Sequence, residues 1–393
     1  MLKIRLLIMT ICVTMTLFAS TRGETPEGLA ESSRFAVTLL TLYRDSDAIY
    51  IARFDKKEDG QLLRAEDGYM VNRVKTHFTV ISALKGDPAK LLELDDEEFR
   101  YRLPTVGQSG GHTSEAVFVK DRGSFDEERS ASPGDKVLLF LRSTGPEREL
   151  ALVDHRDGIK RLGPEDEQAY IARIKELGSI LTGEKFDAAA VAAWLVRCAE
   201  EPATRWEGAF ELERGFRQLD WKERTKRAGG RARDGEGGHA EKSKDQSNNA
   251  EIDLADVAAA VTPHQRGQLT NALLSASYFS VAGAGGTLPA GDIQLLKLVR
   301  RWSSREIAAA AVQRLKYRSD FTTDDVFLMN MVAEIVGDRV AVDHARKLGR
   351  LLTAQKSNAG EPPMGTDQRL ETVMKFIQRI ERPLDIRGNS EVY

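Results

Sequence analysis

The chain has 393 residues, of which 41 % are hydrophobic, 30 % are charged and only 7 % are aromatic. This balance permits buried cores and excludes a collagen-like, fibrous or multi-pass membrane protein. The formal net charge is −3, which argues against a general nucleic-acid binder, because such proteins neutralise phosphates with Lys and Arg. Chains longer than about 300 residues usually divide, so we expect two domains.

The first 23 residues predict an export signal. Lys3 and Arg5 precede Leu6–Phe18, which is apolar and uncharged, and small residues follow at Thr21 and Gly23. The apolar run is shorter than the about 20 residues that span a bilayer, which favours a cleaved signal peptide over the alternative, an uncleaved anchor. Cleavage removes three cations and no acid and leaves a net charge of −6. We therefore expect a periplasmic or extracellular protein without a stable membrane span.

A lead segment, residues 24–45, is followed by a β-rich region at residues 46–162. Val74–Val80 alternates between apolar and polar residues, and Val137–Leu141 is a continuous apolar run, as expected for half-buried and fully buried strands respectively. Turn residues such as Pro133-Gly134 separate the runs. Several short strands in one region predict a small closed barrel or a sandwich.

The apolar spacing becomes helical from residue 163 onward. We expect the first helices of an α domain at residues 163–221 and the rest of that domain at residues 251–393. Helix starts are predicted by two capping boxes, at Thr262–Gln265 and Ser303–Glu306, in which the first hydroxyl and the fourth side chain bond reciprocally to backbone amides. The predicted fold class is therefore α+β, with a β domain followed by an all-α domain.

Two helix pairs, around residues 288–317 and 322–353, are typical of a stacked helical repeat array, and a compact irregular bundle is the alternative. The intervening segment Lys222–Ala250 contains no apolar residue larger than alanine but has five Gly, eight basic and five acidic residues. Because it offers no apolar area to offset the entropy of ordering, we expect a disordered polar insertion.

Cys198 is the only cysteine that signal cleavage would leave. This cysteine belongs to a set of residues with the i, i+3, i+4, i+7 spacing of one helix face: Val191, Trp194, Leu195 and Cys198. We therefore predict a buried thiol rather than a nucleophile, and no internal disulfide.

Three segments of the β region resemble exported modules of the tissue-inhibitor-of-metalloproteinase and netrin type, which are OB-like barrels. These segments are Ser46–Ala52, Phe78–Gly86 and Gly134–Leu141. The helical region resembles HEAT-type repeats, most clearly at Asp292–Tyr317 and Asp324–Leu352. These resemblances imply a fold and an exported setting. The inhibitors present an N-terminal cysteine and several disulfides, which this chain lacks, so metalloprotease inhibition does not carry over and no functional residue is mapped.

One motif suggests chemistry. Gly107–Gly111 satisfies the G-x-S-x-G pattern and resembles the serine loop of chymotrypsin-like proteases, so the alternative hypothesis is a secreted serine hydrolase that uses Ser109 with His77 or His155. A hydrolase needs a helix after the serine, but Thr113–Lys120 has the pattern of a strand. A flexible glycine-rich loop explains the same residues.

Metal binding is not expected. His77, His112 and His155 do not have the spacing of zinc ligands, and consecutive acids at Asp95–Glu98 predict a solvated turn rather than a cation site. The histidines of the helical region, His264 and His344, are interpreted as structural. The sequence therefore predicts no catalytic residue, no cofactor and no metal. We expect a non-enzymatic binding or scaffold protein of the cell envelope or exterior, which binds another protein through its helical array and its barrel loops.

Overall fold

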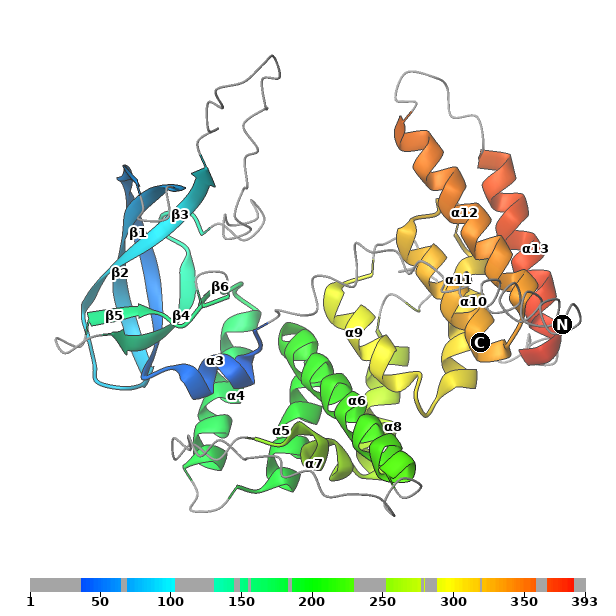
Figure 1. Cartoon of the computed structure of the whole chain (residues 1–393), viewed down its shortest axis with the longest axis horizontal. Coiled ribbons are helices and arrows are strands. Elements are labelled where there is room, and N and C mark those ends of the chain that lie inside the picture. Colours follow the sequence, from blue (N-terminus) through cyan, green and yellow to red (C-terminus); the bar gives the residue numbers. More distant parts are fainter. Residues whose placement is uncertain are drawn as a thin grey trace, which may run out of the picture. The chain divides into compact units, whose positions relative to one another are not determined.

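Figure 1 shows the computed structural model of the chain. The residues that it describes are 37–64, 69–102, 131–144, 149–154, 157–182, 186–229, 252–276, 279, 288–318, 320–357 and 366–384. The chain divides into two units, Met1–Thr38 and Leu39–Tyr393. Only Val37 and Thr38 of the first unit are described, so the predicted signal peptide lies outside the described residues. The sheet and all the helices named below belong to the second unit.

The second unit begins with a short helix and one antiparallel sheet, which curls into a half-barrel (Figure 1). The strand order is β3-β2-β1-β4-β5, and β6 pairs with β4 beside β5. The elements are α3 (Leu39–Asp45), β1 (Ala48–Arg64), β2 (Tyr69–Lys85), β3 (Leu91–Arg102), β4 (Lys136–Thr144), β5 (Glu149–Leu152) and β6 (Ile159–Arg161). The predicted α+β class and its N-terminal β region are confirmed.

Strand β4 is buried on both faces, which explains its continuous apolar run. Val137–Leu141 is completely buried. Alternate residues on this strand contribute to the core inside the curled sheet, where the rings of Phe54 and Phe78 lie 5.7 Å apart. Helix α3 contacts β4 and buries its leucines, including Leu39 and Leu42. This helix lies in the predicted lead segment, where the sequence patterns indicated no element.

The predicted turn at Asp95–Glu98 is wrong, because these residues lie within strand β3. Strand β2 offers a basic partner at this point: Asp95 is the register partner of Lys75, and Lys75 Nζ also lies 3.6 Å from Glu93. Opposite charges across neighbouring strands stabilise such pairing, so the acidic run is accommodated in the sheet.

The rest of the described chain is helical, as predicted. The helices are α4 (Asp166–Leu181), α5 (Ala188–Glu200), η2 (Pro202–Thr204), α6 (Arg205–Gly229), α7 (Leu254–Ala259), α8 (Pro263–Leu274), α9 (Ala290–Val299), α10 (Ser304–Lys316), α11 (Thr323–Val336), α12 (Arg339–Ser357) and α13 (Thr366–Leu384). The two predicted helix pairs correspond to α9 with α10 and α11 with α12. Helices α12 and α13 lie side by side (Figure 1).

Helix α6 extends farther than its apolar pattern indicated. The expected disordered insertion begins at Lys222, but the helix continues to Gly229. Lys, Arg, Glu and Ala favour helix without needing burial, and Lys222 forms an ion pair with Asp253 while Arg227 lies 3.6 Å from Glu223 one turn earlier. Residues 230–250 of the insertion lie outside the described residues.

One of the two predicted capping boxes is confirmed. Thr262 and Gln265 form the reciprocal bonds at the start of α8. At the start of α10 the Ser303 side chain makes no capping hydrogen bond, because its hydroxyl lies 3.0 Å from the Thr270 hydroxyl instead. A further capping box joins Thr322 to Asp325 at the start of α11.

Helix α6 approaches its neighbours closely through two glycines on one face. A Cβ at Gly208 would lie 2.4 Å from backbone atoms of Ala199 and Leu195 on α5, and a Cβ at Gly215 would lie 2.4 Å from the carbonyl oxygen of Leu254 on α7. These contacts need residues without side chains, and they fix the depth at which α6 packs.

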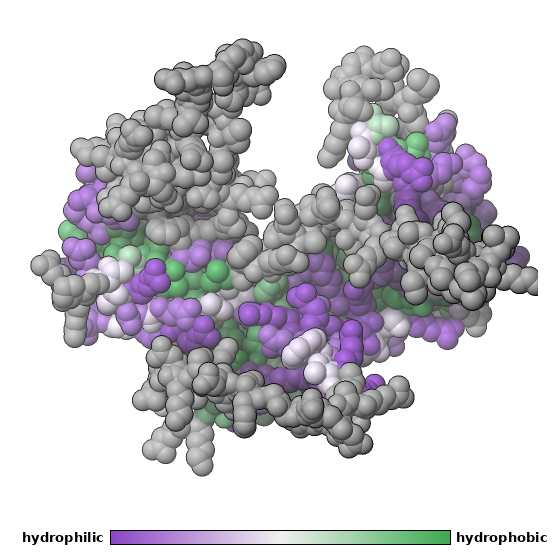
Figure 2. All heavy atoms as spheres, viewed as in Figure 1, coloured by the Kyte–Doolittle hydropathy of each residue, from purple (hydrophilic) through white to green (hydrophobic). Residues whose placement is uncertain are grey.

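Polar side chains cover most of the described helical surface on the face shown in Figure 2, with apolar residues visible in smaller areas between them. This is the expected surface of helices whose apolar stripes are buried. Within the described residues, no helix combines the length and the apolar character needed to cross a membrane.

Candidate functional site

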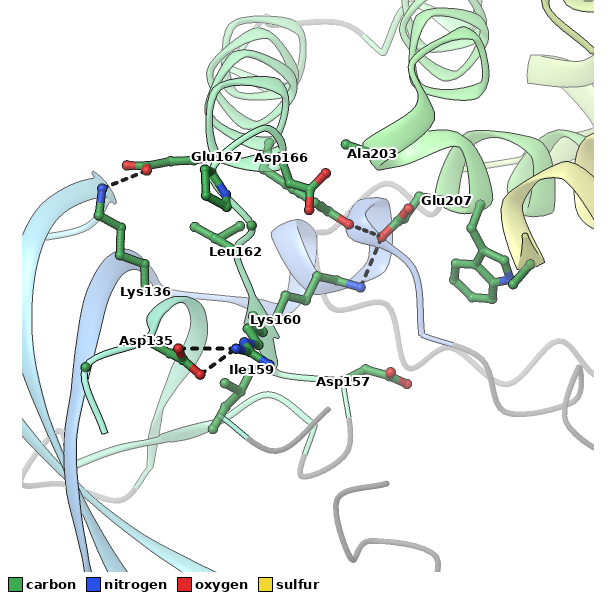
Figure 3. Close-up of a pocket in the computed structure, with 17 residues that line it drawn as sticks. Asp135, Lys136, Asp157, Ile159, Lys160, Leu162, Asp166, Glu167, Ala203 and Glu207 are labelled. Carbon is green, nitrogen blue, oxygen red and sulfur yellow. Dashed lines mark hydrogen bonds and ion pairs between the residues drawn. The ribbon is translucent and has the colours of Figure 1, made fainter. Parts of the chain in front are cut away.

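A pocket lies where the sheet meets the first helices, and we call it the junction pocket. Its cavity volume is about 900 Å³, within the range of small-molecule and peptide sites. Figure 3 shows it in close-up. Its lining comes from the β4 and β6 strands, α4, η2, α6 and α9, and consists of Gly134, Asp135, Lys136, Asp157, Ile159, Lys160, Arg161, Leu162, Gly163, Pro164, Asp166, Glu167, Tyr170, Ala203, Trp206, Glu207 and Ala290.

A buried carboxylate joins three elements in this pocket. Glu207, in the first turn of α6, is only 3 % exposed, and its Oε1 lies 3.1 Å from Lys160 Nζ on β6. The same oxygen accepts a 3.0 Å hydrogen bond from the Tyr170 hydroxyl on α4. Figure 3 shows Lys160 extending from its strand toward Glu207. The start of a helix favours a negative charge. The Lys160 ammonium and the Tyr170 hydroxyl compensate the Glu207 carboxylate for its removal from water.

Tyr170 is held as a hydrogen-bond donor. Burial raises the pKa of Tyr170 well above its ordinary value, and the negative charge of Glu207 raises it further. A phenol in this environment keeps its proton, so Tyr170 serves as a fixed donor to Glu207 and is a poor general base.

Two further ion pairs lie at the pocket wall. Lys136 Nζ is 2.8 Å from Glu167 Oε2, and Arg161 Nε is 3.0 Å from Asp135 Oδ2; both pairs are drawn in Figure 3. Each cation of the lining therefore has a carboxylate partner. The lining contains five carboxylates and three cations, so the pocket has a net negative charge.

The helical wall of the pocket is fixed by a buried ion pair behind it. Arg205 pairs with Asp292 on α9 and donates 3.2 Å and 3.0 Å hydrogen bonds to the carbonyls of Ala199 and Glu200 at the end of α5. The neighbouring Trp206 stacks on Phe210, with ring centroids 5.1 Å apart and planes 18° apart. The pocket thus has a preformed polar and aromatic wall, which is suited to binding.

The alternative serine hydrolase site is not tested by the described residues. Ser109, His112 and His155 lie outside the described residues. His77 lies on β2, where its Nε2 is 2.9 Å from Glu58 Oε1, in ion-pair range but without hydrogen-bond geometry. Its Nδ1 is 3.5 Å from Glu93 Oε1. His77 is therefore flanked by carboxylates of both neighbouring strands, and its pairing with Ser109 remains an untested alternative.

The buried environment of Cys198 is confirmed. The residue is completely buried, and burial raises the pKa of its thiol strongly, which disfavours the reactive thiolate. Within the described ranges, no group of three or more His, Cys, Asp or Glu side chains is arranged to hold a metal ion.

Sequence reasoning did not find the residues of the junction pocket. Lys160, Tyr170, Trp206 and Glu207 belong to three separate elements, and the sequence shows no local motif that joins these elements. The available signal was weak: Tyr170 shares a helix face with Ile174 and Leu177, where a hydroxyl is typical of a buried hydrogen-bonding group.

Comparison with known proteins does not assign the chain. No protein-family model matches it, and neither the curated proteins nor the solved structures give a match.

Proposed function

We propose that this chain is an exported, non-enzymatic binding or scaffold protein of the cell envelope or exterior, and that the junction pocket holds its partner. The observation that carries the proposal is the pocket itself: about 900 Å³ in volume, with its polar wall preformed by Lys160, Tyr170 and Glu207. Groups held in fixed pairs favour recognition, since little reorganisation is needed on binding.

The resemblances support the same proposal. A barrel module of the tissue-inhibitor-of-metalloproteinase and netrin type and a HEAT-type array are both architectures that present surfaces to other proteins. The half-barrel sheet and the helical C-terminal half are compatible with that layout. Export rests on the charged and apolar pattern of the first 23 residues.

A pull-down tests the proposal. The tagged mature chain is incubated with an envelope fraction beside an Ala203→Phe variant, which places a larger side chain in the pocket. The matched control is Ala189→Phe, which makes the same change at an exposed position of α5. We expect a specific partner that the control retains and Ala203→Phe loses. A partner profile that is identical for all three proteins, or no partner at all, contradicts the proposal.

The hydrolase alternative is tested separately with a serine-reactive fluorophosphonate probe. A binding protein does not react with the probe above the level of the Ser109→Ala variant. Labelling that requires Ser109 together with either His77 or His155 contradicts the non-enzymatic proposal.

A further inference from the structure

We propose that the outer edge of strand β6 pairs with an extended, basic peptide segment of a partner protein, which lies in the junction pocket. The inference rests on the proposed binding function and names the class of its partner. Three observations carry it: backbone groups on β6 that have no partner among the described residues, the pocket beside them, and the net negative charge of the lining.

The hydrogen-bond register shows which backbone groups of β6 point away from the sheet. Among the strands that the structure describes, β6 pairs with β4 only. The Leu162 amide donates to the Lys136 carbonyl, and the Phe140 amide donates to the Gly158 carbonyl. In an antiparallel pair the bonded positions alternate, so the amides and carbonyls of Ile159 and Arg161 point outward.

These outward groups have no hydrogen-bond partner among the described residues: no hydrogen bond there reaches the backbone amide or carbonyl of Ile159 or Arg161. Both residues line the junction pocket. An unpaired strand edge is a template for an added strand, and edge pairing is a recognised mode of peptide binding, in which adjacent pockets select the side chains.

The charge of the pocket specifies a basic segment. The three cations of the lining are already paired with Asp135, Glu167 and Glu207. Asp166, in the first turn of α4, has no ion pair within the described residues, so its carboxylate leaves the lining with a surplus of negative charge. An arginine or lysine side chain of the paired peptide would be attracted to this surplus.

Binding is measured by fluorescence anisotropy with the purified full chain. The probe is a labelled, end-blocked hexapeptide of alternating Val and Arg. Three competitors separate the parts of the proposal: the same peptide with Glu in place of Arg, the same peptide methylated on alternate backbone nitrogens, and spermidine. We expect the basic peptide to bind at least tenfold more tightly than each of the three, because only it both pairs with the edge and complements the charge.

Two variants test the site on the protein. Ile159→Pro removes an outward amide that is not part of the β4 ladder, a position where proline is tolerated in edge strands, and we expect an affinity loss of at least tenfold. Asp166→Asn should weaken binding about threefold to tenfold. The matched control, Glu165→Gln, makes the equivalent change at an exposed neighbour that does not line the pocket and should retain full affinity.

The contradicting results are distinct. Equal binding of the methylated peptide shows that the edge is not used, and this comparison does not depend on the folding of any variant. Equal binding of the acidic peptide or of spermidine contradicts the basic-strand proposal, as does an absence of binding. If these peptide tests fail while Ala203→Phe still loses an envelope partner, the proposed function stands and only the class of partner is wrong.

Discussion

The ammonium of Lys160 lies 3.1 Å from a carboxylate oxygen of Glu207, and this contact links the last strand of the sheet to the first turn of α6. The side chains are 17 % and 4 % exposed, so both charges are largely removed from water. In such a pair, the attraction between the two charges compensates each of them for the hydration that it loses on burial. The pair therefore bears on the stability of the sheet–helix junction as well as on the pocket.

Glu207→Gln should destabilise the chain by about 3 kcal/mol, because it leaves the Lys160 ammonium nearly buried without its counter-charge. The measurement is urea unfolding followed by circular dichroism. Lys160→Met and the double variant complete a double-mutant cycle. We expect the double variant to be more stable than the sum of the single losses implies, and additive losses would show that the two charges are not coupled.

Gly208→Ala should cost about 1–3 kcal/mol, since overpacking forces a shift of neighbouring backbone, and here the new Cβ would meet α5 at 2.4 Å. The control is Gly267→Ala within α8, where no described atom outside its own stretch of helix lies within 4 Å of the added Cβ. That change should stabilise the chain by about 1 kcal/mol, because alanine favours helix over glycine. The measurement is the thermal unfolding temperature of each variant relative to that of the natural chain. Equal effects would contradict the close packing of α6 on α5.

The architecture could be predicted because it depends on local periodicity. The alternating residues of Val74–Val80 and the continuous run Val137–Leu141 correspond to β2 and β4, and the helical spacing around Trp194 and Cys198 corresponds to the buried face of α5. These patterns record which side of an element faces the core. Such a pattern can be recognised in the sequence without knowing which helix or strand packs against the element.

The site could not be predicted, because its residues are brought together by the tertiary fold. Lys160, Tyr170 and Glu207 meet only after the sheet, α4 and α6 have packed. Ser303 shows the same limit at one helix start: its sequence context fits a capping box, but Thr270, on α8, takes the hydroxyl. Long-range contacts override local preference wherever a polar group has two possible partners.

Cys198 should be inert toward thiol reagents in the native chain without residues 1–23, in which it is the only thiol. Its complete burial and the raised pKa of its thiol require local opening before reaction. If opening costs about 3 kcal/mol, labelling slows about 100-fold. The measurement is the rate of reaction with a chromogenic disulfide at pH 8, with and without urea. Rapid native labelling would contradict the buried environment.

The helical region should lose stability below neutral pH through His344 on α12. Burial lowers the pKa of His344, and the positive charges of Lys347, Arg379 and Lys375 lower it further, while Asp343 opposes them. An unfolded histidine takes up a proton near its ordinary pKa of about 6.5, and the folded one resists until lower pH. Stability is therefore full above the unfolded pKa and decreases as the pH falls through it toward the folded pKa.

Two variants check this pH dependence by urea unfolding between pH 7.5 and 5.5. His344→Gln removes the titrating group and should lose less stability over this range than the natural chain. Asp343→Asn removes the carboxylate that favours the protonated ring and should lose more. Parallel stability curves for all three proteins would mean that His344 binds its proton equally in the folded and unfolded chain, which is incompatible with the cationic surroundings that α12 and α13 give it.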